Sequence, residues 1–362
     1  MSEEARYNAQ SPDSGEILNN SAIQASDATG QEAATFDRLP DFWERLAGKF
    51  RSNNSLALIL KPLDLFSLFR PLLVVAGLLP ALLGFLASGY IDAIIGDEET
   101  KMDPTGLSSL ALPIFLLCAS VFIINQIYDK DADKKGKKHL PIAEGLISVR
   151  LAWIVYYIVS IIAAAIAFAH GILPGILVIV GIGLGLLYSL PQVSLKDKPW
   201  AGLLLNGLGH GYLVYLIGFL WSTPIAWKPF VTGIPFIFAY AGVYLFTTIP
   251  DMNQDKVFGK RTFAVVFGQR KAAGLALGLI LLTTGIGILF EQPALFLTGL
   301  FSLPFYIYSF LKGHGHNNAA MTSVILLTIF ASFYYFWPFP LAVVVAAIVW
   351  FHNRMRYGVS YP

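Results

Sequence analysis

The amino-acid sequence predicts an all-α polytopic membrane protein, a bundle of about nine transmembrane helices in which a tenth crossing is left open. Hydrophobic residues make up 56% of the 362 residues and charged residues only 13%, and the mean hydropathy is +0.62. A soluble core of this size cannot enclose so many apolar side chains. Because lipid offers the backbone no hydrogen-bond partners, the spanning segments must be helices.

Apolar stretches of spanning length recur along the chain. They lie at about residues 71–95, 106–128, 148–170, 172–190, 200–222, 229–250, 270–290, 293–312 and 320–336. The stretch from Phe339 to Phe351 follows two prolines and is short for a crossing, so a tilted tenth span and a half-buried tail are both open. The basic end around Arg354 and Arg356 favours the tenth span, because the crossing would return it to the side of the other basic loops.

Four segments are expected. Residues 1–40 are polar and contain no apolar run, which is typical of a disordered tail, and we expect neither a signal peptide nor a span there. Residues 41–68 mix aromatic and aliphatic side chains with Lys and Arg, as an interfacial amphipathic segment does. Residues 69–352 then form the transmembrane domain, and residues 353–362 a basic C-terminal tail.

The distribution of basic residues predicts the orientation. Connections near residues 130–138, 196–198, 256–271 and 312 carry Lys and Arg, whereas the intervening connections carry almost none. By the positive-inside rule every other loop is cytoplasmic, and we expect an integral protein of the cell (inner) membrane. The net charge of +2, with no basic stripe, gives no sign of a nucleic-acid partner. Cys118 is the only cysteine, so disulfides and thiolate metal sites are excluded.

Two acidic clusters follow long apolar runs on the predicted cytoplasmic side. The first contains Asn125, Asp129 and Asp133, and the second contains Asp251 and Asp255. The four-residue spacing places each set on one face of a helix end. Neighbouring carboxylates repel one another, and the usual remedy is a hard divalent cation with oxygen ligands. We therefore expect these five residues to be metal ligands and catalytic residues.

A weak internal repeat predicts that the two clusters face each other across one cavity. Each cluster ends an even-numbered span and is followed by a basic loop, a glycine and a hydroxyl residue, Gly145 with Ser148 and Gly259 with Thr262. Repeats in membrane proteins commonly place their site at the interface between the halves.

Such a cavity suits the chemistry of a diphosphate. Carboxylates on opposite walls would bind Mg²⁺, two ions being expected, and phosphate oxygens would complete the coordination. Lys137, Lys138, Lys260 and Arg261 in the same loops would neutralise further phosphate charge. Metal-bound diphosphate is a good leaving group, and an allylic hydrocarbon tail lying in the bilayer would ionise to a carbocation.

In these residues the sequence resembles the UbiA superfamily of intramembrane prenyltransferases, whose two motifs are N-x-x-x-D-x-x-x-D and D-x-x-x-D. Asn125, Asp129 and Asp133 match the first motif, and Asp251 and Asp255 match the second. The resemblance covers roughly residues 65–336. It implies a helical bundle around a central cavity, Mg²⁺ as cofactor and an isoprenyl diphosphate as donor. It also implies a lipophilic or aromatic acceptor and the release of diphosphate.

The resemblance extends to other positions. The runs at residues 140–148 and 255–262 are similar to the family, as are Arg70 before the first span and Tyr188 and Lys196 around the end of the fourth. These three residues are therefore expected to bind substrate. His139-Leu140-Pro141 stands where Arg-Pro is frequent in the family, and Lys137 and Lys138 are the candidates to replace that arginine.

Two polar residues within the fifth span have two open interpretations. Asn206 and His210 share a helix face with Gly202 and point into the bundle. A cavity-facing role would let them contact the diphosphate or accept the proton that the acceptor loses, whereas an interhelical hydrogen bond would be structural.

Two other classes of protein also carry acids beside membrane helices. A CDP-alcohol phosphotransferase has Asp-Gly-x-x-Ala-Arg before its spaced aspartates, and neither cluster here is preceded by it. The acids of an ion-coupled transporter would more naturally lie at the bilayer midplane than at the ends of spans.

Overall fold

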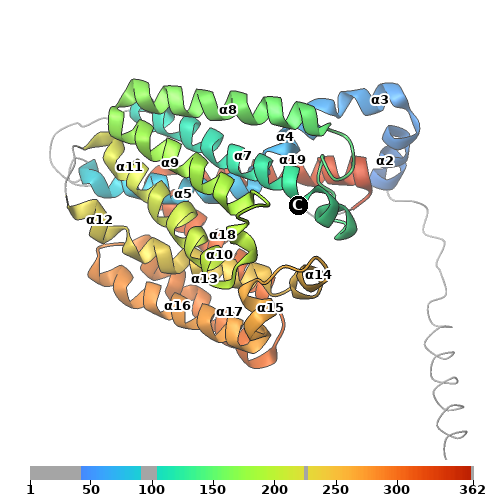
Figure 1. Cartoon of the computed structure of the whole chain (residues 1–362). Helices are drawn as coiled ribbons and strands as arrows, with labels where there is room; N and C mark the ends of the chain where they lie inside the picture. The colour runs from blue at the N-terminus through green and yellow to red at the C-terminus, as the bar shows by residue number, and fades with distance from the viewer. Residues whose placement is uncertain (1–41, 91–103, 224–226, 360–362) are drawn as a thin grey trace, which may run out of the picture.

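The computed structural model describes residues 42–90, 104–223 and 227–359, which form helices and connecting loops (Figure 1). No β-strand occurs within these ranges, so the predicted all-α class is confirmed. The expected polar tail at residues 1–40 lies outside the described residues.

Ten helices in the described ranges are long and apolar enough to cross a membrane. Seven of these spans consist of a single helix. Five of the seven are α7 (Pro104–Lys135), α8 (Val149–His170), α9 (Ile172–Ser189), α16 (Gln269–Leu289) and α17 (Pro293–Lys312). Two more close the chain, α18 (His316–Tyr335) and α19 (Pro338–Tyr357). The other three are built from shorter helices, α5 (Pro71–Phe85) with η1 (Leu86–Tyr90), α10 (Pro199–Leu205) with η3 (Asn206–Leu213) and α11 (Val214–Ser222), and α12 (Lys228–Thr232) with α13 (Ile234–Thr248).

At the C-terminal end, the chain forms a helix that is long and apolar enough to be a tenth span. Helix α19 runs without a break from Pro338 to Tyr357, so the boundary expected at residue 352 falls inside it. Gly358, at φ 76°, ends the helix in the left-handed region that glycine favours. The basic residues of the expected tail are therefore largely the last turn of a helix.

The segment expected at the membrane interface forms three short helices, which lie beside the last span, α19. They are α2 (Phe42–Ser52), α3 (Asn54–Ile59) and α4 (Lys61–Leu68). Helix α2 packs against α19, and Ala47, Leu60 and Met355 form a small buried cluster between them. The last span thus covers part of this segment, whereas Phe42, Leu58 and Ile59 remain exposed.

Helices α5 and α11 approach each other closely because glycine lines their contact. A Cβ atom on Gly218 would lie 1.9 Å from the carbonyl oxygen of Ala81, and one on Gly84 would lie 2.2 Å from that of Tyr215. Small residues let membrane helices pack backbone to backbone.

The fifth span contains a π-helical segment, η3, in its middle. A Cβ atom on Gly207 or Gly211 would lie 2.5 Å or 2.4 Å from a carbonyl oxygen of α13. The wider π turn is uncommon and is frequent at functional sites. Here it places Asn206 and His210 on the wall of an internal cavity.

The acidic clusters lie on different kinds of element. Helix α7 continues beyond the expected end at residue 128 and carries the whole first cluster to Lys135. Helix α13 ends at Thr248, just before Pro250. The second cluster lies at the separate short helix α14 (Met252–Val257), with Asp251 at its N-cap and Asp255 within it. Helix α15 (Phe263–Phe267) follows before the chain re-enters the bundle.

Candidate active site

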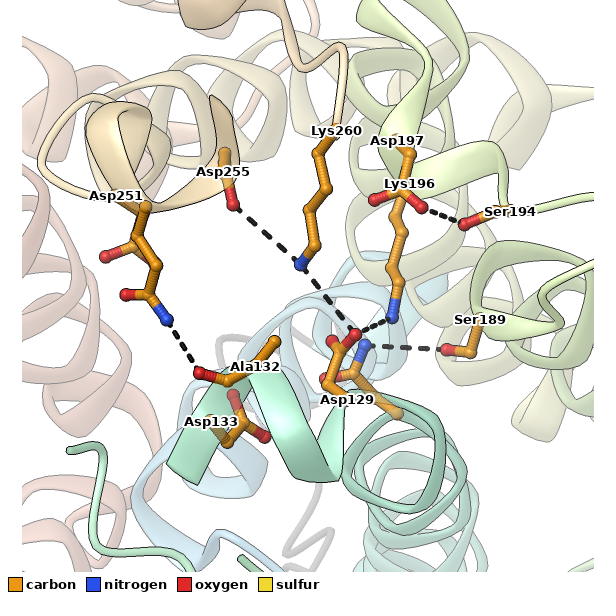
Figure 2. A network of polar contacts seen from close by, with 12 residues as sticks. Asp129, Ala132, Asp133, Ser189, Ser194, Lys196, Asp197, Asp251, Asp255 and Lys260 are labelled. Carbon is orange, nitrogen blue, oxygen red and sulfur yellow. Dashed lines mark hydrogen bonds and ion pairs between the residues drawn. The ribbon is translucent and has the colours of Figure 1, made fainter. Parts of the chain in front are cut away.

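The two acidic clusters meet at one end of the bundle, and lysines lie between them. The ammonium nitrogen of Lys260 lies 3.7 Å from Asp129 Oδ1 and 3.8 Å from Asp255 Oδ1. Figure 2 shows Lys260 reaching from the loop after α14 toward the end of α7. The structure therefore brings both clusters to one site.

A second lysine joins the other two aspartates. Lys138 Nζ lies 3.1 Å from Asp251 Oδ2 and 3.7 Å from Asp133 Oδ1. The Asp133 carboxylate is nearly buried, whereas the side chains of Lys138 and Asp251 are 37% and 42% exposed. Of the four acids, Asp251 thus lies at the rim of the site, whereas the side chains of Asp129, Asp133 and Asp255 lie deeper.

Asp129 contacts a second lysine, Lys196. Lys196 Nζ lies 2.7 Å from Asp129 Oδ1, and the Lys196 side chain is only 9% exposed. Lys196 belongs to the short 3₁₀ segment η2 (Leu195–Asp197) after α9. The contact is an ion pair by distance and lacks the alignment of a linear hydrogen bond. Asn125, one turn before Asp129, donates from Nδ2 to Ser189 Oγ at 3.5 Å.

A side chain of one cluster also binds the backbone of the other. Gln254 Nε2 donates to the carbonyl oxygen of Ala132 at 2.7 Å. Gly136 makes this possible, because a Cβ atom there would lie 2.2 Å from Gln254 Nε2. The link fixes α14 against the end of α7.

The internal repeat is visible in the local geometry. Gly145 and Gly259 both have positive φ, 74° and 70°, where glycine is favoured. Ser148 then caps α8 by accepting the Leu151 N–H at 3.1 Å, whereas Thr262 precedes α15 and donates to Asp255 Oδ2 at 3.3 Å. The two loops share a glycine with positive φ before the hydroxyl residue, but only the Thr262 hydroxyl contacts an aspartate.

The charges outside the spans are perturbed by this packing. Burial raises the pKa of Asp255 above its usual value by more than the facing Lys260 lowers it. Burial would lower the pKa of Lys260, but Asp129 and Asp255 outweigh it and the pKa is raised. Lys260 therefore stays protonated. An additional cation near Asp255 would stabilise the ionised form of its carboxylate.

The donor atoms fit Mg²⁺ shared with a phosphate. Among the described residues no three His, Cys, Asp or Glu side chains form a ready-made metal cage. Mg²⁺ is usually held by one or two carboxylates, with waters and phosphate oxygens completing its octahedron. Asp129, Asp133, Asp251 and Asp255 supply such carboxylates in facing pairs, and Asn125 supplies an amide oxygen beside them.

An apolar cavity lies within the bundle, and Tyr188 on its wall is within electrostatic reach of Asp129. It is bounded by α7, α9 and the fifth span. Its walls are mostly aliphatic, with Cys118 and Val121 on the face of α7 that carries Asn125 farther along. Tyr188, Asn206 and His210 supply its polar groups.

Asn206 lines the cavity and also forms the interhelical hydrogen bond of the second interpretation. Its Nδ2 donates to Tyr188 Oη at 3.1 Å and to the Gly202 carbonyl at 2.9 Å. His210 lines the same cavity and stacks on Phe122 at 5.7 Å.

Of the remaining residues expected to bind substrate, Arg70 lies near the acids, whereas the side chains of Lys137 and Arg261 do not contact them. Arg70 adopts a left-handed conformation at φ 51°, and its guanidinium lies 5.8 Å from the Phe122 ring centre, within electrostatic reach of Asp133. The side chains of Lys137 and Arg261 are exposed and contact none of the acids. Arg261 takes part through its backbone N–H, which donates to the Asp197 carbonyl at 3.0 Å.

Sequence reasoning missed two residues of the network. Asp197 accepts a short hydrogen bond from Ser194 at Oδ2, and its Oδ1 is buried without a partner near Lys260 (Figure 2). Gln254 lies between the two aspartates of its own motif, and an amide at this position could have been recognised as a possible hydrogen-bond donor of the site. Asp197 adjoins Lys196 in sequence, which was the corresponding signal.

The fold and the site define a class of protein, a helical membrane protein that carries a cationic and acidic site above an apolar cavity. Such a site suits an amphiphile with an anionic head and a hydrocarbon chain. The chain belongs to the UbiA prenyltransferase family, whose model matches residues 77–317.

Individual relatives agree with this assignment. The chain is 32% identical over 199 residues to a probable homogentisate phytyltransferase 2, chloroplastic, of Oryza sativa subsp. japonica, which covers 51% of this chain and 52% of that protein. It is 31% identical over 206 residues to the chloroplastic homogentisate solanesyltransferase of Arabidopsis thaliana, which covers 52% of each. The chain thus spans about half the length of these curated relatives.

A solved structure shares the fold. The UbiA homolog from Archaeoglobus fulgidus bound to GPP and Mg²⁺ superposes with a TM-score of 0.59 at 20% identity. The alignment covers 76% of this chain and 99% of that one. Helices α2 to α4 and the whole of α19 lie outside the residues that the family model matches.

Proposed function

We propose that the protein is an integral membrane prenyltransferase. It transfers an isoprenyl group from an isoprenyl diphosphate to a lipophilic or aromatic acceptor and releases diphosphate. The observation that carries the proposal is the position of Lys260 between Asp129 and Asp255, above an apolar cavity. Family membership favours prenyl transfer over a CDP-alcohol phosphotransferase or an ion-coupled transporter.

The lysines and acids together suit a diphosphate. Lys138, Lys196 and Lys260 lie within 4 Å of the acids, so incoming phosphate oxygens find three ammonium groups in place. Mg²⁺, two ions in our proposal, would stabilise the negative charge that grows on the leaving group. Asn125 and the four motif aspartates would hold these ions, and Arg70 and Lys138 would contact the outer phosphate.

The reaction balances as a substitution at carbon. The bond between the allylic carbon and the diphosphate oxygen breaks, and diphosphate leaves with the electron pair. A new bond forms between that carbon and the acceptor, which loses a proton. The dry walls of the cavity protect the allylic cation from water until the acceptor attacks.

The polar groups of the cavity suit a phenolic acceptor. The two plant relatives are named for homogentisate, an aromatic acid. We place a ring of this kind beside Tyr188 and Asn206, with His210 as the group that accepts the released proton. These three residues are the polar groups that line the cavity.

The identity of the donor tests the proposal. Purified protein in liposomes receives an allylic diphosphate or its saturated analogue, with Mg²⁺ and homogentisate. We expect diphosphate release and a prenylated product by mass spectrometry from the allylic donor only, because only the allylic cation is delocalised. The saturated analogue should inhibit competitively. Equal turnover of both donors, or release of CMP from a CDP-alcohol, would refute prenyl transfer.

We also propose that the site faces the cytoplasm from the cell (inner) membrane. The loops carrying Lys138, Lys196 and Lys260 lie at one end of the bundle, as the positive-inside rule favours. In a Cys118→Ala background, Lys256→Cys should react with impermeant thiol reagents only from the cytoplasmic side, and Glu291→Cys only from the other. The reverse pattern would overturn the orientation.

A further inference from the structure

A buried ionic cluster joins the N-terminal helices to the last span. Asp64 of α4 is 3% exposed. Its Oδ1 accepts hydrogen bonds from His352 Nε2 at 2.8 Å and from Arg356 Nε at 3.0 Å, and its Oδ2 accepts a short one from Arg356 Nη2. Arg356 also donates to the Ala57 carbonyl of α3 at 3.3 Å. We call Asp64, His352 and Arg356 the Asp64 cluster.

The cluster fixes the end of α19, where the next residue is Tyr357. The Tyr357 ring stacks on His139 with centroids 5.1 Å apart and an interplanar angle of 25°. It also meets His352 edge-on at 5.7 Å. The phenol oxygen of Tyr357 is buried and has no hydrogen-bond partner, so the ring itself makes the contact with the loop.

The loop that Tyr357 touches is strained and carries a lysine of the site. Lys137 and His139 have φ of 52° and 50°, a conformation that costs free energy in residues other than glycine and persists where neighbours enforce it. Lys138, between them, reaches Asp251 and Asp133. His139 is held on its other side by Glu144, with Nδ1 and Oε1 3.0 Å apart.

We propose that Tyr357, anchored by the Asp64 cluster, is a positioning residue that holds Lys138 in place for the diphosphate of the donor. The inference rests on the proposed function. It gives a role to helices α4 and α19, which the family model does not match. The contacts run from Asp64 to His352, from His352 to Tyr357 and from Tyr357 to His139, which directly follows Lys138 in the chain.

Two substitutions at Tyr357 separate positioning from stability. Tyr357→Phe keeps the ring and removes only the unpartnered hydroxyl, whereas Tyr357→Leu removes the stack on His139. We expect Tyr357→Phe to behave as the native protein. Tyr357→Leu should raise the donor KM, and the dissociation constant of the saturated analogue, by about three- to thirtyfold with little change in kcat.

A double-mutant cycle with Lys138→Ala tests the route. If Tyr357 acts through Lys138, then Tyr357→Leu should weaken analogue binding no further in the Lys138→Ala background. Tyr308→Leu is the control, since it removes an aromatic contact with His314 at 5.4 Å on another loop. It should leave analogue binding unchanged.

Other outcomes would overturn the proposal. Additive effects of Tyr357→Leu and Lys138→Ala, or equal losses in Tyr357→Phe and Tyr357→Leu, would show that Tyr357 does not position Lys138. A lowered melting temperature with an unchanged donor KM would show a purely structural role. Failure of the native protein to bind the analogue at all would instead refute the proposed function, so the two failures are distinguishable.

Discussion

Lys196 and Asp129 form the least exposed ion pair of the site, with 2.7 Å between Nζ and Oδ1 and side chains 9% and 15% exposed. Removing Lys196 leaves the Asp129 carboxylate with only the more distant Lys260, 3.7 Å away. The loss of a partner from a buried pair costs more than the loss of one from an exposed pair. This relationship makes Lys196 a structural support for Asp129 as well as a candidate ligand of the diphosphate.

We expect Lys196→Met to weaken binding of the saturated donor analogue by about 30-fold or more, because a buried charge pair is broken. The melting temperature should also fall. Lys198→Met removes a nearby lysine whose side chain is exposed, and it should alter neither quantity. Calorimetric titration and thermal unfolding in detergent provide the measurements. Equal effects at residues 196 and 198 would contradict the role of the buried pair.

Single substitutions of Asp129, Asp133, Asp251 or Asp255 by Ala should abolish turnover, and excess Mg²⁺ should not restore it. Each aspartate is a proposed ligand, and chelation with EDTA should abolish native turnover in the same way. Asp131→Ala is the matched control on α7, because the Asp131 side chain is exposed. Product formation is measured by mass spectrometry. Near-native activity at two of the four positions would refute the assignment.

Filling the cavity should block the substrate without disturbing the fold. Gly209 lines the cavity, and a Cβ atom there would meet nothing within 4 Å. Gly209→Leu should therefore lower kcat/KM by about tenfold or more at an unchanged melting temperature. Gly183→Leu, equally unobstructed but outside the cavity lining, is the control. Unchanged kcat/KM in Gly209→Leu would mean that substrate does not enter here.

The Asp64 cluster predicts a pH dependence of stability. Burial raises the pKa of Asp64, but the hydrogen bonds from His352 and Arg356 outweigh it and hold the pKa below its ordinary value of 3.8. The ionised form therefore stabilises the fold above pH 3.8, and this contribution is lost as the pH falls through the lowered pKa. Asp64→Asn should lose about 3 kcal/mol at pH 7.

The difference between native protein and Asp64→Asn should stay constant from pH 7 to about pH 5 and shrink only below the ordinary carboxyl value. Thermal unfolding in detergent at several pH values measures it. A difference that closes already between pH 7 and pH 5 would show that another group governs the stability.

The close contact of α5 with α11 predicts that adding a single methyl group at Gly218 lowers the stability of the protein. Gly218→Ala should destabilise the protein by about 1–3 kcal/mol, because the new Cβ atom would collide with the Ala81 backbone. Gly183→Ala meets no neighbour and should leave the melting temperature unchanged or raise it slightly. Equal melting temperatures for the two variants would contradict the close packing.

The spans and the two motifs were predictable because both are local properties of the sequence. A run of apolar residues predicts a span wherever it lies, and acids four residues apart share a helix face in any helix. The tenth span was the difficult case, since its apolar stretch is short and its last turn is polar. Packing of α2 against α19 covers part of that turn, and hydropathy along the chain does not register such a contact.

The lysine pairing of the site was not predictable. Lys137 and Lys138 are adjacent and chemically identical, yet only Lys138 reaches the acids, because the left-handed turn at Lys137 directs the two side chains differently. The π-helical segment that places Asn206 and His210 depends on contact with α13, which lies far along the chain. Such features depend on tertiary packing, which a single sequence does not encode in any local pattern.

The hydrogen bond from Gln254 to the Ala132 carbonyl has a consequence for how the sequence can vary. Its acceptor is a main-chain oxygen, which every amino acid presents, whereas its donor is a specific amide that needs a bare backbone at Gly136. Homologues that keep this link should therefore vary freely at position 132 and hold glycine at 136 and an amide at 254. A larger residue at 136 should be accompanied by a smaller one at 254.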